Sequence, residues 1–76
     1  MILAYVRKGC EKAELSTIQT LVMMKVAAGY TNKEIADKTS QSIDYIRNIG
    51  WQVRKKLGAK NRVHAVLKLA EEGMAS

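Results

Sequence analysis

The sequence predicts a small all-α domain, and three observations support this prediction. The chain has 76 residues, which is the size of a single domain. It contains no proline and only 5% aromatic residues, while residues that favour helix are common. Capping signals followed by apolar residues at helical spacing recur along the chain. These signals predict a domain over residues 15–76 with helices at about 16–28, 32–38, 42–57 and 61–72, preceded by an N-terminal extension over residues 1–14.

The first two predicted helices begin at capping boxes. In the sequence STIQ, the Ser16 hydroxyl can accept from the amide of Gln19 while the Gln19 side chain reaches back. TNKE, which begins at Thr31, has the same pattern. The second helix is short, and Ile35 and Ala36 are its only candidates for burial. So small an apolar face cannot hold a helix alone, so we expect it to lie against its neighbours.

The third predicted helix has two different faces. Ser42 is its expected N-cap, and Gly58 ends it. At about 100° per residue, one side carries Ile46, Gly50, Val53 and Leu57, with Ile49 at its edge. The other side carries Asp44, Arg47, Asn48, Trp51, Arg54 and Lys55. The sequence therefore predicts a helix with one face in the core and a largely basic face toward solvent or a partner.

The fourth predicted helix begins at Asn61 and has an apolar arc too wide for one core. Ala65, Val66 and Leu69 form the face expected to be buried. A second stripe lies about 90° away and consists of Val63, Leu67, Ala70 and Met74. The simplest partner for this stripe is a second copy of the chain, which would make a homodimer. The alternative is that residues 1–14 fold back over it.

The positive charge lies mainly in the second half of the chain. The net charge is +6. Residues 45–70 contain no acid and seven basic residues, which are Arg47, Arg54, Lys55, Lys56, Lys60, Arg62 and Lys68. Charge on one side of a small domain is typical of proteins that bind nucleic acid, and a solvated basic face is the alternative.

No residue pattern predicts an enzyme, a cofactor or a metal site. His64 is the only histidine, and no carboxylate or cysteine is placed to form a site with it. Cys10 lies in what the sequence presents as a charged tail. A single cysteine and no zinc-ligand spacing leave hydrophobic packing to hold the fold, as suits a protein of the cytoplasm.

The quoted segments together resemble a known family. LS..Q..VM..VA.GYTNKEIA, then a serine, IR, and V...LGAKNR..AV...A..G match the LuxR-type (GerE-like) helix-turn-helix domain in residue type and spacing over residues 15–73. The pair GYTNKEIA and KLGAKNRVHAV is specific, whereas either segment alone is weak. The resemblance implies a four-helix domain whose third helix enters the major groove of DNA and whose fourth helix pairs two subunits.

The resemblance also implies roles for individual residues. Thr31 and Lys33 would approach phosphates from the start of the second helix, and Ser42 would meet the DNA backbone. Arg47 stands where the family usually has a lysine that faces DNA. Asn48 and Trp51 occupy variable positions that face the bases. With Arg54 and Lys55 from the same basic face, these residues form the predicted DNA-binding site.

The chain departs from the family pattern at several positions. Thr39 and Gln41 lie in the turn, where apolar residues are usual. The other departures are Lys25 at an apolar position of the first helix, and Tyr45, Ile49 and Gly50 in the third helix. Gly50 costs about 1 kcal/mol relative to alanine in a helix.

Two functions follow from these observations. The first is a dimeric, sequence-specific transcriptional regulator of the cytoplasm, associated with the nucleoid. The second is an anti-activator type of interaction protein that uses the same fold to bind and block another regulator. Trp51 separates them, because it can contact DNA, anchor a protein partner, or turn inward and cover Gly50. The family usually joins this domain to a receiver or ligand-binding domain, and neither fits in 76 residues. We therefore expect any signal to act through expression level, dimerisation or a separate partner.

Overall fold

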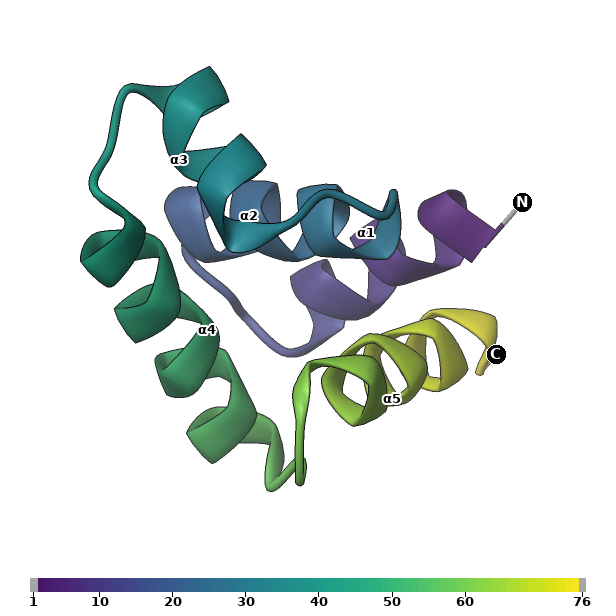
Figure 1. Cartoon of the computed structure of the whole chain (residues 1–76). Coiled ribbons are helices and arrows are strands. Elements are labelled where there is room, and N and C mark those ends of the chain that lie inside the picture. The colour runs from purple at the N-terminus through teal and green to yellow at the C-terminus, as the bar shows by residue number, and fades with distance from the viewer. Residues whose placement is uncertain (1, 76) are drawn as a thin grey trace.

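The computed structural model describes residues 2–75 and contains five helices (Figure 1). They are α1 (Ile2–Lys12), α2 (Thr17–Ala27), α3 (Asn32–Thr39), α4 (Ile43–Leu57) and α5 (Arg62–Met74). The described part of the chain has no strand, and this confirms the predicted all-α class. Four of the helices lie where the sequence predicts them. The fifth, α1, was not predicted, because residues 1–14 were assigned to an extension. In residues 2–75, no helix is long and apolar enough to cross a membrane.

The predicted caps set the starts of α2, α3 and α4. The Gln19 and Glu34 amides donate to the hydroxyls of Ser16 and Thr31, each at 3.2 Å, and both side chains reach back to complete the boxes. The hydrogen bond from the Thr31 amide lowers the pKa of Glu34, because it favours the carboxylate. The Ser42 hydroxyl accepts from the amide of Tyr45 at 3.1 Å. These predictions depend only on local sequence, and all are confirmed.

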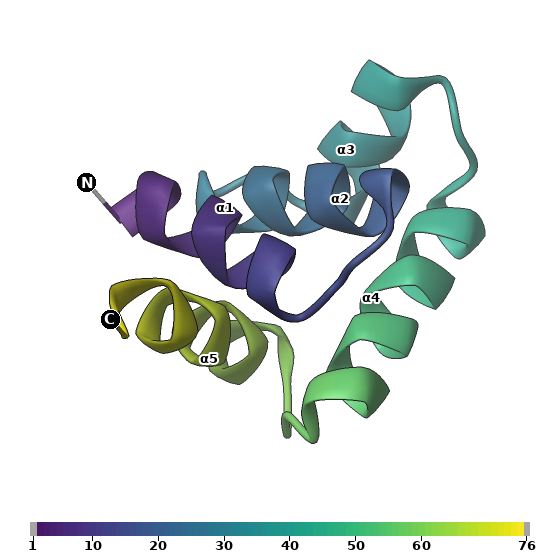
Figure 2. The ribbon, with the colours of Figure 1, turned by 180° about the vertical axis from the view of Figure 1, so that it is seen from behind.

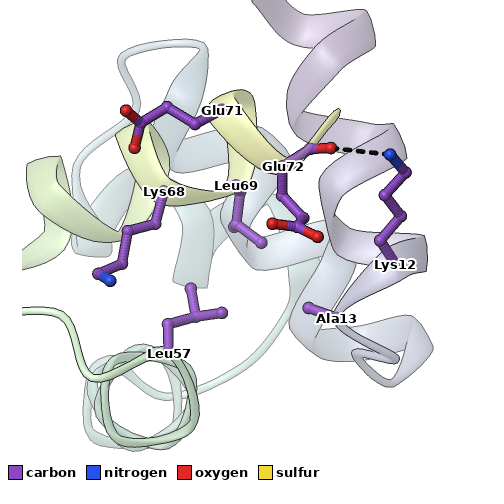
Figure 3. Close-up of a pocket in the computed structure, with 7 residues that line it drawn as sticks. All are labelled: Lys12, Ala13, Leu57, Lys68, Leu69, Glu71 and Glu72. Atoms are coloured by element: carbon purple, nitrogen blue, oxygen red, sulfur yellow. Dashed lines mark hydrogen bonds between the residues drawn. The ribbon is translucent and has the colours of Figure 1, made fainter. Parts of the chain in front are cut away.

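The helix α1 packs along α5 in the opposite direction. Figures 1 and 2 show the two helices side by side, with the start of α1 near the end of α5. Gly9 of α1 approaches the Leu69 backbone, and Gly73 of α5 approaches the Tyr5 backbone. The Lys12 amine donates to the carbonyl of Glu72 at 3.0 Å (Figure 3) and to that of Ala75, the residue after α5, at 2.6 Å. A lysine that donates to carbonyls at the end of a helix stabilises that end, so Lys12 ties α1 to the end of α5.

Two predictions about this region were wrong. Ala70, assigned to the exposed stripe, is 3% exposed and packs in a core cluster with Val6 and Cys10 of α1. Cys10, assigned to a charged tail, is completely buried. Both errors have one cause: residues 2–12 were not predicted to be helical. Of the segment 1–14, whose folding back was the alternative, residues 2–12 cover the part of α5 that contains Ala70.

The buried side chains form two clusters. The larger joins α1, α2, α4 and α5, and its buried members are Val6, Cys10, Met23, Val53, Ala65, Leu69 and Ala70. The smaller consists of Val22, Ile35, Ala36, Ile46 and Ile49. This second cluster packs α3 and α4 on α2 and so orients the two helices of the helix-turn-helix motif. It also confirms that Ile35 and Ala36 are the buried residues of the short helix.

The turn between α3 and α4 accommodates the two polar residues at which the chain departs from the family. The Thr39 hydroxyl donates to the carbonyl of Ile35 at 2.7 Å, so this half-buried polar group has a partner. Ser40 adopts the left-handed conformation, with φ 56° and ψ 38°. The Gln41 amide then donates to the carbonyl of Ala36 at 2.9 Å, which is the hydrogen bond of a Schellman end. The turn is therefore closed without apolar residues at these positions.

Candidate nucleic-acid interface

The outer face of α4 carries most of the predicted DNA-binding residues. Arg47, Asn48 and Lys55 are exposed, while Ile46 and Val53 on the opposite face are fully buried. Figure 1 places α4 at one edge of the molecule, with the other helices on its inner side. A packed inner face fixes the rotation of the helix, and its polar side chains therefore point outward. The two faces predicted from the helical periodicity are confirmed for these residues. Gly50, which was assigned to the core side, instead lines a surface hollow with Arg47 and Trp51, and Ile49, which was placed at the edge, is buried.

Trp51 lies on this outer face and is 54% exposed. The amine of Lys55 lies 5.5 Å from the centre of its ring, which is within the range of a cation–π interaction. More than half of the Trp51 surface is in solvent, so the interpretation in which this side chain turns inward and covers Gly50 in the core is wrong. Two interpretations of this side chain remain, namely that it contacts DNA or that it contacts a protein partner.

Three further predicted DNA-binding residues lie at the starts of α3 and α4. Lys33 is exposed on the first turn of α3. The hydroxyls of Thr31 and Ser42 are also at the surface, and each accepts one backbone hydrogen bond as a cap. A hydroxyl that accepts still has its own proton to donate, so both can also bind an anion. The starts of α3 and α4 therefore offer three donors beside the outer face of α4.

Arg54 has a structural contact that the sequence did not predict. Its Nη2 donates to the carbonyl of Lys60 at 2.8 Å, across the connection between α4 and α5. Its Nε is buried and has no hydrogen-bond partner within the described residues. Arg54 thus holds the connection to α5 while its charge stays at the edge of the outer face.

Arg62 is a residue of this region to which the sequence assigned no role. Its Nη1 donates to Oδ1 of Asn32 at 2.7 Å, so it joins the start of α5 to the start of α3. The sequence showed Arg62 only as one member of the basic segment. Residues 32 and 62 are far apart in the sequence, so no local pattern could reveal this pair.

The stripe on α5 is smaller than predicted. Val63 is 69% exposed, Leu67 50% and Met74 57%, while Ala70 is buried against α1. His64, the single histidine, is half-buried, and its Nδ1 accepts from the amide of Lys60 at 3.0 Å. No group of three or more His, Cys, Asp or Glu side chains in residues 2–75 could hold a metal ion.

A comparison with protein families identifies the domain. The family model of GerE, described as bacterial regulatory proteins of the luxR family, matches residues 13–69. No curated protein and no solved structure matches the chain. The family match spans most of the chain and includes α2, α3, α4 and the greater part of α5. It confirms the resemblance seen in the sequence and indicates a DNA-binding transcription regulator. The chain therefore belongs to the luxR family of bacterial regulatory proteins.

Proposed function

We propose that this protein binds specific sequences of duplex DNA as a homodimer, with α4 in the major groove. The observation that carries the proposal is the outer face of α4, where Arg47, Asn48 and Trp51 are exposed above a buried inner face. The major groove admits one α-helix, and the base edges that distinguish sequences are accessible there. Arg47 is suited to guanine, because its fork can donate to O6 and N7 together. Its ion pair with Asp44, at 3.5 Å, is exposed and therefore weak enough to exchange for a base.

Phosphate contacts would supply most of the affinity in this arrangement. Thr31, Lys33 and Ser42 lie at the starts of α3 and α4, and Lys55 lies on the outer face of α4. Contacts to phosphate position a protein on the duplex and make binding depend on salt, but they do not distinguish bases. The net charge of +6 favours the approach to DNA.

The exposed stripe of Val63, Leu67 and Met74 supports the homodimer. The three side chains lie on one side of α5, because positions four and eleven residues apart nearly coincide on a helix. Two copies related by a twofold axis would bury this stripe and present two α4 helices to two half-sites. Such a regulator would act in the cytoplasm, on the nucleoid.

The proposal predicts different effects for Arg47→Ala and Lys55→Ala. We expect Arg47→Ala to cost about 1–3 kcal/mol on the preferred duplex and to relax the preference at one base pair. Lys55→Ala should weaken binding to all duplexes alike and make the salt dependence less steep. Selection from a pool of random duplexes gives the preferred sequence, and fluorescence anisotropy at several salt concentrations then measures each variant. Equal losses for both variants on every duplex would show that α4 does not distinguish bases.

The exposure of Trp51 also favours a second candidate function, an interaction protein that binds and blocks another regulator. The two functions differ in what changes the fluorescence of this tryptophan. In the DNA-binding protein, duplex DNA changes the emission at low salt and the change disappears as salt rises. In the interaction protein, no duplex changes the emission, but a regulator from the same cell does.

A further inference from the structure

A hollow lined by arginines lies beside the outer face of α4. It has a volume of about 320 Å³ and is formed between the start of α3, the middle of α4 and the start of α5. Its lining residues are Asn32, Arg47, Gly50, Trp51, Arg54 and Arg62. Three of these six carry a positive charge and none carries a negative charge. The hollow between α1, α4 and α5 differs, because Lys12 and Lys68 line it together with Glu71 and Glu72 (Figure 3).

Two of the three guanidinium groups are held in place by neutral partners. Arg62 donates to the side-chain amide of Asn32 at 2.7 Å, and Arg54 donates to the carbonyl of Lys60 at 2.8 Å. These hydrogen bonds orient both groups and leave their charges without a counter-ion. The only ion pair within residues 2–75 joins Arg47 to Asp44, and both of those side chains are mostly in solvent. Arg54 and Arg62 therefore bring to the hollow two positive charges for which the described residues provide no ion-pair partner.

Gly50 keeps this space open. Apart from residues 49 and 51 and the nearby backbone of α4, no atom lies within 4 Å of the position of a Cβ on Gly50, so a side chain added there would extend into the hollow that Gly50 lines. Glycine is unfavourable inside a helix by roughly 1 kcal/mol, and the packing of α4 does not require it. A binding site in the hollow gives a reason for a glycine at this position.

We propose that this hollow, the Gly50 pocket, binds a phosphate group. The guanidinium fork matches the spacing of phosphate oxygens, and a charge-assisted hydrogen bond of this type is about twice as strong as a neutral one. The pocket borders the face of α4 that carries Arg47 and Trp51. In the DNA complex proposed above, this group is a backbone phosphate beside the bases that α4 contacts. This choice of phosphate rests on the proposed function. A free phosphate compound is the other source of the same chemistry.

The pair Gly50→Leu and Gly50→Ala tests the proposal. Leucine fills the pocket, whereas alanine adds one methyl group and leaves most of the space open. Both substitutions favour helix, and circular dichroism verifies the fold. We expect Gly50→Leu to lower the affinity for every duplex roughly tenfold and to make the slope of log K against log salt shallower by about one. Gly50→Ala should bind as the parent does.

A second pair of variants removes charge without adding bulk. Arg62→Gln removes a positive charge from the pocket, and Lys68→Gln removes one from the hollow between α1, α4 and α5. Only Arg62→Gln should reproduce the loss of affinity and the shallower slope. Parent-like affinity in both Gly50→Leu and Arg62→Gln excludes a DNA phosphate as the occupant.

Pyrophosphate distinguishes the two sources and separates this proposal from the proposed function. Trp51 lines the pocket, so its emission reports an anion bound there. If the parent binds no duplex, the proposed function fails, but the pocket is still tested by titration with pyrophosphate at low salt. If Gly50→Leu and Arg62→Gln bind duplex DNA as the parent does, or the parent binds none, a change of emission in the parent that is absent from Gly50→Leu identifies a free phosphate compound as the occupant. If neither duplex affinity nor the response to pyrophosphate differs between these two proteins, the proposal is overturned.

Discussion

The thiol of Cys10 lies in the core cluster between α1, α2 and α5. Burial raises its pKa, because the thiolate loses its hydration, and this effect exceeds the opposing hydrogen bond with Thr20. The folded protein therefore keeps the proton at a pH at which the unfolded chain has released it. In physiological conditions Cys10 is a small apolar core residue and not a nucleophile.

This raised pKa predicts a loss of stability at alkaline pH. The contribution of Cys10 to the free energy of unfolding is complete below the ordinary pKa of a thiol. It is lost as the pH rises toward the higher pKa that the thiol has in the folded protein. Within that window the free energy of unfolding falls by at most about 1.4 kcal/mol per pH unit. Urea unfolding between pH 7 and pH 10 measures this loss, and Cys10→Ala is the control because it shares every other titrating group. A parallel decrease in both proteins would mean that Cys10 does not contribute.

At the scale of elements, the contact between α1 and α5 depends on two glycines. A Cβ on Gly9 would collide with the carbonyl group of Leu69, and a Cβ on Gly73 would collide with that of Tyr5. Both collisions are with backbone, which cannot move aside as a flexible side chain can. The close approach also places Val6 of α1 and Ala70 of α5 in the same core cluster.

The effect of a glycine-to-alanine substitution on stability should therefore depend on where the glycine lies, and three variants test this. Gly73→Ala and Gly9→Ala force the two helices apart, and we expect each to cost about 1–3 kcal/mol or more. Gly50→Ala, where a Cβ meets no atom beyond the adjacent residues and the backbone of α4, should stabilise α4 by roughly 0.5–1 kcal/mol. Chemical denaturation measures all three free energies. A Gly73→Ala protein as stable as the parent would contradict the α1–α5 packing.

At the scale of the whole molecule, the proposed homodimer depends on the stripe that α1 leaves uncovered. Leu67 lies between Val63 and Met74 in this stripe. In Leu67→Glu a charge would be buried at the dimer contact without a partner, which is strongly unfavourable. We expect sedimentation at micromolar concentration to show a dimer for the parent and a monomer for this variant.

Leu21→Glu is the matched control for this experiment. Leu21 is also an exposed leucine, but it lies on α2 and outside the stripe. Its substitution by glutamate should leave the dimer intact. If Leu67→Glu is folded by circular dichroism and has the same mass as the parent, the dimer does not form through α5.

Parts of the site that depend on one helix could be predicted from the sequence, whereas parts that depend on polar contacts between distant segments could not. The exposed face of α4 was predictable, because a single helix repeats its pattern every few residues. The Gly50 pocket was not, because Arg62 meets Asn32 only after α3 and α5 have packed around α4. Arg54 appeared on the basic face in the sequence, but its hydrogen bond to the Lys60 carbonyl depends on the path of the α4–α5 connection.

The sequence alone is enough to predict the all-α class, the family and the four caps at Ser16, Thr31, Ser42 and Asn61. A cap is a hydrogen bond between residues three positions apart, so it is encoded where it forms. Only the tertiary structure decided that residues 2–12 form a helix, that this helix buries Cys10 and Ala70, and that it leaves Leu67 exposed. The apolar arc of a predicted helix shows how much of the helix surface is expected to be buried. It does not show which neighbour covers each part, because that depends on how closely two backbones approach, and here Gly9 and Gly73 set that distance.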